Sequence, residues 1–139
     1  MNNNKLELKK VQKSDLPFLY ELLKKRDPQT NISHKKMPTY TQHVKFVTSK
    51  PYKSWYVVHM DAQKVGSVYL SKQNEIGIFL LKEYQGLKLG KKVLKLLMEK
   101  NPEERYLANV SPKNHRSINF FEENKFRLIQ YTFEFIPRH

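Results

Sequence analysis

The chain changes hydrophobic period several times, and these changes divide it into predicted strands and helices. Leucines that alternate with charged residues predict a first strand over residues 6–11. Leucines at helical spacing then predict a helix that begins at Ser14 or Asp15 and stops before the Asp-Pro pair at 27–28. A second helix is predicted over 39–47.

The middle of the chain has the pattern of strands on short turns. Strands are predicted over 55–58, 65–70 and 75–81, because β-branched and aromatic residues gather there between polar turns. Three strands on such short connections favour an antiparallel meander.

The last third returns to a helical period and then ends in strands. A helix is predicted from Gly90 to Asn101, followed by a strand over 106–110 and a short helix over 117–124. The chain is expected to close with strands over 126–129 and 131–136, separated at Gln130. The order βααβββαβαββ predicts an α/β fold, with a mixed, mostly antiparallel central sheet flanked by helices.

Composition narrows the class of protein. A length of 139 residues and a mass of 16.7 kDa suit one domain over 1–139. The apolar fraction of 39% is too high for a disordered chain. A net charge of +13 favours anionic partners such as nucleic acid, phosphorylated cofactors or an acidic membrane surface.

The chain contains no cysteine, which excludes disulfides, a thiol nucleophile and cysteine-based metal sites. This composition fits a reducing, cytoplasmic location. We expect no signal peptide and no membrane association, because the first residues lack an apolar core and no apolar run approaches the ~20 residues of a membrane span.

The segment 75–94 is the most informative part of the sequence, because a predicted strand leads through a loop with Gly86 and Gly90 into a helix. Free N–H groups at a helix start attract phosphate, and Lys88, Lys91 and Lys92 add charge there. The plain alternative is a helix start with ordinary glycines and solvated lysines. The pattern alone leaves both interpretations open, since it contains neither a Walker-type GxxxxGK[ST] nor a GxGxxG motif.

This loop, Gln85-Gly86-Leu87-Lys88-Leu89-Gly90, resembles the acetyl-CoA loop of the GCN5-related N-acetyltransferase (GNAT) superfamily. The family pattern is Gln/Arg-x-x-Gly-x-Gly/Ala between the fourth strand and the third helix. The chain matches at Gln85 and Gly90, while Lys88 stands where the middle glycine is usual. A side chain at that position would either crowd the pyrophosphate or point outward and pair with a phosphate.

A second segment, 114–126, resembles the family's Asn-x-x-Ala/Ser-Ile-x-x-Tyr-Glu-x-x-Gly-Phe motif. Lys125 replaces the usual glycine, and Phe121 stands where many members carry a tyrosine. Two motifs at the right separation, in the right order of elements, make the resemblance specific.

The resemblance implies direct transfer of an acetyl group from acetyl-CoA to an amine, with no metal. Main-chain groups of the fourth strand would pair with the pantetheine arm, and amides of the glycine loop would hold the pyrophosphate. The implied cofactor contacts are Ile78, Phe79, Leu80, Gln85, Gly86, Leu87, Lys88, Leu89, Gly90, Lys91, Asn114, Ser117 and Phe121.

The acceptor amine must lose a proton before it attacks, so a general base is expected near the cleft. Glu75 is the first candidate because it opens the strand beside the thioester; the alternative is a surface carboxylate at a strand end. His34, His43 and His59 are further candidates, since imidazole titrates near neutral pH. A surface or structural role is the alternative for each of them.

Phe121 cannot donate a proton to the leaving thiolate. Either another hydroxyl replaces the family tyrosine or water protonates the thiolate. Tyr84 is the first candidate, and Tyr106 and Tyr131 are also available.

The loop 26–40 is long, polar and basic, which suits an anionic acceptor such as a nucleotide-linked amino sugar. His34, Tyr40 and Trp55 are the predicted acceptor-binding residues, although lysines that solvate a loop and an aromatic in the core would look the same. A peptide or protein amine is the second enzymatic possibility.

Two interpretations without catalysis stay open: a module that only binds acyl-CoA, and a nucleic-acid-binding module. The second is disfavoured because the lysines are dispersed and no RNA- or DNA-binding motif is present. A homodimer is also left open, as is whether the final strands complete the sheet of a neighbouring chain.

Overall fold

The computed structural model describes residues 5–26, 36–86 and 88–138. Its elements, in chain order, are β1 (Leu6–Lys10), η1 (Lys13–Asp15), α1 (Leu16–Lys24), α2 (Tyr40–Thr48), β2 (Ser54–Met60), β3 (Gln63–Leu70), β4 (Ile76–Leu80), η3 (Lys82–Tyr84), α3 (Leu89–Lys100) and α4 (His115–Glu123). The helices and strands predicted from the hydrophobic pattern as far as the start of α3 are confirmed, with ends that differ by a few residues. Among these residues, no helix has both the length and the apolar character that a membrane crossing requires.

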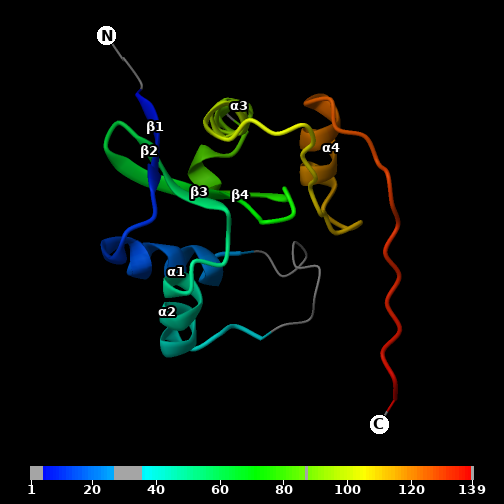
Figure 1. Ribbon diagram of the computed structural model, residues 1–139, viewed down its shortest axis with the longest axis horizontal. Helices are drawn as coiled ribbons and strands as arrows, with labels where there is room; N and C mark the ends of the chain where they lie inside the picture. Colours follow the sequence, from blue (N-terminus) through cyan, green and yellow to red (C-terminus); the bar gives the residue numbers. More distant parts are fainter. Residues whose placement is uncertain (1–4, 27–35, 87, 139) are drawn as a thin grey trace.

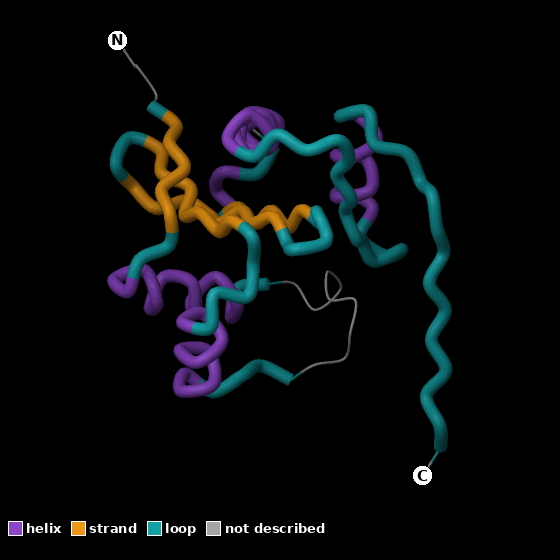
Figure 2. The backbone as a smooth tube through the Cα atoms, in the orientation of Figure 1, coloured by secondary structure: helices purple, strands orange, loops and turns teal. Residues whose placement is uncertain are grey.

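Four strands form an antiparallel sheet in the order β1-β2-β3-β4. Helix α3 lies on one face of this sheet, α1 and α2 lie on the other, and α4 stands beyond the β4 edge (Figure 1). The same arrangement is clear in the backbone tube, where the strands form a thin layer between the helices (Figure 2).

Each face of the sheet carries its own core. On the α3 face, side chains of all four strands pack against Leu89, Val93, Leu94 and Leu97. On the opposite face, Val57 packs against leucines of α1 and against α2. Because successive side chains of a strand point to opposite faces, the central strands are apolar nearly throughout, which explains the continuous run Trp55–Val58.

The predicted start of the first helix is confirmed at Asp15, although its carboxylate does not cap the α1 amides. Instead Oδ2 accepts a hydrogen bond from the Gln12 N–H at 2.8 Å, and Oδ1 pairs with Lys64 Nζ at 2.6 Å. Helix α2 begins with a capping box, in which Thr39 and Gln42 each bond the main chain of the other. The Asp15–Lys64 ion pair thus ties the start of α1 to β3, while the capping box fixes where α2 begins.

Three predicted strands near the C-terminus do not form within the part of the chain that the structure describes. The segment 106–110 makes only a single parallel bridge, between Leu107 and Glu75. Residues 126–129 and 131–136 are extended but belong to no sheet. A strand needs a hydrogen-bonding neighbour, and here the sheet stops at β4 while the last residues run away from it beyond α4 (Figure 1).

His59, on β2, gives the fold a predicted pH dependence. Burial, helped by the nearby charge of Lys9, lowers the pKa of His59 below its ordinary value of 6.5. The folded chain therefore keeps the ring neutral while the unfolded chain protonates it, so stability is complete above pH 6.5 and is lost as the pH falls toward the folded pKa. We expect the urea midpoint to fall between about pH 7.5 and about pH 5.5, and to fall less in His59→Gln. Equal slopes in both proteins would contradict this assignment.

Candidate active site

The outer edge of β4 offers unpaired main-chain groups. The Ile76 N–H donates to the Leu107 carbonyl at 2.7 Å, so Ile76 faces away from β3. Strand alternation then turns the groups of Ile78 and Leu80 outward as well, and directs Phe79 to its β3 partner Ser67. The Leu80 carbonyl is already occupied by Gln85 Nε2 at 2.9 Å. Two N–H groups, of Ile78 and Leu80, and the Ile78 carbonyl therefore face the open edge.

This edge is open because the next segment of chain leaves it after one bridge. Leu107 bonds the main chain of Asn74 and Ile76, at 2.8 and 2.7 Å, and the bridge ends there. Beyond it, Ile78 and Leu80 have no described strand on their outer side. An extended ligand can therefore take the place of a strand along β4, as the family resemblance implies for the pantetheine arm.

The loop 85–88 ends in the helix start of α3. Gly86 has a φ of 77° and open space around the position where a Cβ would be. Lys88 is the N-cap residue of α3, is left-handed with a φ of 61°, and makes no side-chain cap. The first amides of α3, at Leu89 and Gly90, therefore meet no side-chain acceptor from the N-cap residue. Leu87 lies outside the described residues.

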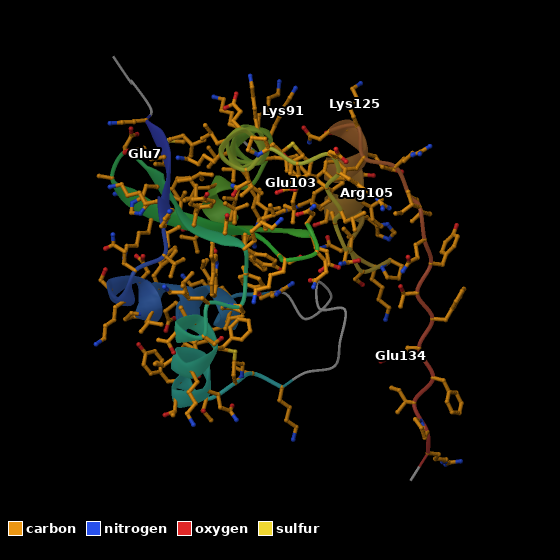
Figure 3. The ribbon with its side chains drawn as sticks, in the orientation of Figure 1. Glu7, Lys91, Glu103, Arg105, Lys125 and Glu134 are labelled. Carbon is orange, nitrogen blue, oxygen red and sulfur yellow. The ribbon has the colours of Figure 1, made fainter. Side chains whose placement is uncertain are left out.

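The left-handed backbone explains why the family favours glycine where Lys88 stands. A residue with a Cβ pays about 1 kcal/mol to adopt this conformation. The Lys88 side chain is exposed, as are those of Lys91 and Lys92, and none of the three forms an ion pair with a described carboxylate. Lys91 projects from the outer side of α3 (Figure 3). The helix start thus combines free amides with unneutralised positive charge.

Gly90 has a different role from the one its motif position suggests. A Cβ there would lie 2.9 Å from the ring of Phe120 on α4. Gly90 is therefore needed for the close packing of α4 on α3, whereas Gly86 is the glycine that borders open space. The approach of an anion at both glycines stays a prediction.

The start of α4 is held beside the glycine loop. Arg116 donates through Nη1 to Gln85 Oε1, so Gln85 bridges β4 and α4. Asn114 is the N-cap of α4, and its Oδ1 accepts from the Ser117 N–H at 3.2 Å. Asn114 Nδ2 makes no hydrogen bond to a described residue and could therefore bind a ligand. Both polar side-chain atoms of Gln85, Oε1 and Nε2, are already hydrogen-bonded. Arg116 was not predicted from the sequence, although it stands within the second motif.

Glu75 is held by two hydrogen bonds at the point where β4 and the 106–110 segment meet. Its Oε1 accepts from Ser71 Oγ at 3.1 Å, and its Oε2 accepts from Asn109 Nδ2 at 2.7 Å. Ser71 Oγ itself accepts from two main-chain N–H groups, so its proton points to Glu75. A carboxylate has about four lone-pair sites, which leaves two for a substrate proton.

Tyr84 lies at the other end of β4. Its hydroxyl donates to Gln63 Oε1 at 3.2 Å, next to the first residues of β3. Leu80 and Glu75 are five residues apart, or about 16 Å along a strand. Glu75 and Tyr84 therefore cannot act together on one reacting carbon, and the predicted pair of catalytic residues does not assemble.

Phe121 and Tyr106 have structural roles. Phe121 is buried and packs edge-on against Phe120 and Phe126, with ring centroids 5.1 Å apart in both pairs. The Tyr106 hydroxyl donates to the Asn101 carbonyl at 2.6 Å and accepts from the Glu103 N–H at 2.9 Å. Tyr131 is 75% exposed on the C-terminal segment, away from β4.

The histidines are also placed by structural contacts. His43 is buried with Nε2 3.1 Å from the Leu16 carbonyl, and His59 is buried within β2. Neither lies on β4 or on the glycine loop. His34 lies outside the described residues.

An aromatic cluster, defined as Phe46, Tyr52, Trp55 and Tyr69, lies on the α1/α2 face of the sheet. Tyr52 stacks on Tyr69 with centroids 3.8 Å apart, and Trp55 meets Tyr52 edge-on at 4.8 Å. Burial, reinforced by Tyr69, raises the pKa of Tyr52 far above its ordinary value, so its hydroxyl stays protonated. Trp55 was predicted as an acceptor contact, and here its Nε1 donates to Ser67 Oγ at 2.8 Å. The other three residues of the cluster were not predicted.

The aromatic cluster borders the β4 residues that share its face. Tyr69 pairs with Gly77, and the Tyr69 ring fills the space where a Gly77 Cβ would stand. Strand alternation puts Glu75, Gly77 and Phe79 in one row on this face. Arg26, at the end of α1, lies over the Phe79 ring at 4.8 Å. Tyr40 is exposed at the start of α2 and packs on Tyr20, at 5.1 Å, outside this row.

The geometry agrees with a comparison against known families. The model of the Acetyltransferase (GNAT) family matches residues 16–126. The chain belongs to this family. It is therefore an acetyl-CoA-dependent N-acetyltransferase. A search of curated protein sequences gives no match.

Several solved structures share the fold. A domain from Methanocaldococcus jannaschii superposes with a TM-score of 0.79 at 20% identity, covering 94% of this chain and 93% of that chain. The aminoglycoside N-acetyltransferase AAC(6')-Iy, in complex with CoA, gives 0.73 at 13% identity and covers 99% and 98%. The spermidine N-acetyltransferase of Vibrio cholerae, bound to CoA and spermine, gives 0.68 at 18% identity and covers 85% and 78%.

Proposed function

We propose that this GNAT enzyme acetylates the primary amine of a small, anionic acceptor that carries a planar ring, such as a nucleotide-linked amino sugar. The observation that supports this acceptor is the aromatic cluster, which adjoins the β4 row of Glu75, Gly77 and Phe79. Stacking surfaces suit a nucleobase. The Arg26 guanidinium, which lies over Phe79, brings positive charge to this face.

Acetyl-CoA supplies the activated acetyl group and a thiolate leaving group. The residues present fit this ligand in three places: the outward groups of Ile78 and Leu80 for an extended amide-bearing arm, the open space at Gly86 with the first α3 amides for a diphosphate, and the exposed lysines for a further phosphate. The N–H groups of Ile78 and Leu80 are the donors available to polarise a carbonyl at this edge.

Glu75 is the group that accepts the proton of the acceptor amine in this proposal. Ser71 and Asn109 hold its carboxylate in place, and strand alternation puts the side chain on the α1/α2 face, where the acceptor would stack. Water protonates the thiolate, because Phe121 has no acidic proton and Tyr84 lies at the far end of β4. The direct transfer needs no residue that becomes acetylated.

A screen of amines tests the acceptor class. Released CoA can be followed with a thiol reagent, and the chain contributes no background because it contains no cysteine. We expect nucleotide-linked amino sugars to give a higher kcat/KM than the same sugars without the nucleotide. A higher kcat/KM for peptides or for polyamines would show that they, and not nucleotide-linked amino sugars, are the acceptors. The conclusion that the enzyme transfers acetyl groups would be unaffected.

Phe46→Ala probes the stacking surface with little risk to the core, since the Phe46 side chain is 47% exposed. We expect KM for the acceptor to rise roughly 5- to 150-fold, the loss of one base–aromatic stack of about 1–3 kcal/mol, with kcat and the Kd for acetyl-CoA unchanged. Phe46→Tyr keeps the ring and is the matched control. An unchanged KM in Phe46→Ala would remove the aromatic cluster from acceptor binding.

A further inference from the structure

The side chain of Tyr69 reaches across the strand next to its own. Tyr69 lies on β3 and pairs with Gly77 on β4, the outermost strand on that side of the sheet (Figure 1). A Cβ at Gly77 would overlap Cε2, Cζ and the hydroxyl oxygen of Tyr69. The far end of the ring therefore lies over Gly77, so the Tyr69 hydroxyl stands on β4, on the α1/α2 face. The side chain is half-buried, which leaves room for a water molecule at the hydroxyl.

This position brings the hydroxyl to the part of β4 where acetyl transfer is proposed to occur. Gly77 directly precedes Ile78, whose outward N–H is available to polarise the thioester carbonyl. Glu75 lies two residues before Gly77 on the same face, so Glu75 and Tyr69 are diagonal neighbours, about 7–8 Å apart along the sheet. Unlike Tyr84, Tyr69 is therefore close enough to Glu75 for both side chains to act at one reacting carbon.

Tyr52 fixes the direction in which Tyr69 can donate. The two rings are stacked, with planes 4° apart, and their hydroxyls form a hydrogen bond. Burial, the neighbouring Tyr69 and this hydrogen bond all raise the pKa of Tyr52, as expected for the residue that donates in the pair. The Tyr69 oxygen is then the acceptor, and its own proton is left for a different partner. The hydrogen bond from Tyr52 also stabilises negative charge on the Tyr69 oxygen after that proton has left.

Two charged groups face this pair of tyrosines in the described part of the chain. Arg26, at the end of α1, is close enough to favour negative charge on the pair. Glu75, on β4, is held by Ser71 and Asn109. A base and a hydroxyl donor thus flank Gly77 on the face from which the acceptor amine would approach.

We propose that Tyr69 is a further catalytic residue, whose hydroxyl gives its proton to the water that protonates the thiolate. This inference rests on the proposed function for the place of the thioester on β4, but it applies to any acceptor amine. The amine nitrogen bonds to the thioester carbon and its proton passes to Glu75. The C–S bond then breaks, and the electron pair stays on sulfur. The water gives a proton to the sulfur and takes one from Tyr69, and the phenolate regains a proton from solvent.

Tyr69→Phe tests this role because it removes the hydroxyl and keeps the ring that stacks on Tyr52. We expect kcat to fall about 10²-fold, the lower end of the effect of a positioned proton donor. The alkaline limb of the kcat profile against pH should flatten, because the donor that must stay protonated is gone. KM for the acceptor and the Kd for acetyl-CoA should not change, and the melting temperature reports on the fold.

Tyr56→Phe is the matched control. Tyr56 lies on β2 and packs on the α3 face, where its hydroxyl accepts from Asn101 Nδ2 at 3.1 Å. The control removes a tyrosine hydroxyl from the opposite face of the same sheet, so it should keep the parental kcat and pH profile. A parental kcat in Tyr69→Phe, or a lower kcat with the alkaline limb intact, would overturn the proposal.

Tyr52→Phe is a second variant that leaves the Tyr69 hydroxyl in place. It should lower kcat by roughly 2- to 10-fold, the effect of one hydrogen bond onto the Tyr69 oxygen. A larger loss in Tyr52→Phe than in Tyr69→Phe would assign the proton to Tyr52 and reject Tyr69. All of these kinetics use the amine with the highest kcat/KM in the acceptor screen, whatever its class. A wrong acceptor class is therefore detected in the screen, whereas a wrong proton donor is detected in the variants.

Discussion

Replacing Glu75 with glutamine is expected to lower kcat by roughly 10²–10⁴-fold, the usual contribution of a general base. Glutamine keeps the size of the side chain and can still accept a hydrogen bond from Ser71 or Asn109, but it cannot take the proton of the amine. The falling acid limb of the kcat/KM profile against pH should flatten, while the Kd for acetyl-CoA, measured by calorimetry, stays the same.

Glu103→Gln is the matched control for this experiment. Glu103 is another partly buried carboxylate, paired with Lys53 at 3.1 Å and close to Asn74, but it does not lie on β4. Its variant should keep the parental kcat and pH profile. If Glu75→Gln also keeps them, the carboxylate has only its structural role of joining the 71–75 turn to Asn109.

Replacing Gly86 with glutamate is expected to weaken binding of acetyl-CoA by on the order of 10²-fold, about 2.7 kcal/mol. The new carboxylate would stand in the open space where the diphosphate is proposed to lie, and like charges in a binding site cost several kcal/mol. Titration calorimetry with acetyl-CoA and with CoA measures the change, and the melting temperature of the variant reports on its fold.

Gly86→Gln separates charge from backbone strain. Both variants force a side chain into a φ of 77°, which costs about 1 kcal/mol in either case. Glutamine should therefore weaken binding far less than glutamate. Equal affinities in the two variants would place the diphosphate elsewhere. Gly90 is a poorer position for this test, because any side chain there meets Phe120 and disturbs the contact between α3 and α4.

The order of elements from β1 to α3 could be predicted because each has an unambiguous period and a clear start. The box of Thr39 and Gln42, for instance, marks the beginning of α2 in the sequence itself. The helix after α3 was also predicted correctly, over 117–124 against α4, but the strands were not. Apolar and polar residues alternate over 131–136 as they do in a strand. Alternation shows which face of a strand each side chain takes, but it does not show whether a neighbouring strand is present.

Within the candidate site, the sequence located the β4 edge and the glycine loop but not the contacts across the fold. Arg116 and Gln85 are 31 residues apart, and Tyr52 and Tyr69 are 17 residues apart, so no local pattern joins them. The separation of Glu75 from Tyr84 is likewise a consequence of strand length. It emerges only when the two residues are placed beyond opposite ends of β4.

Two lysines take left-handed backbone conformations where the family motifs have glycine: Lys88 before α3, with a φ of 61°, and Lys125 after α4, with a φ of 74°. Each gives up about 1 kcal/mol of folding free energy, a noticeable share for a protein of this size. The chain is thus less stable to heat than it would be with glycine at these two positions, and it carries a lysine at each of them. At Lys88 the charge lies at the proposed phosphate site, whereas glycine at position 125 would remove the strain without touching that site, which makes position 125 the natural starting point for a more heat-resistant form of the enzyme.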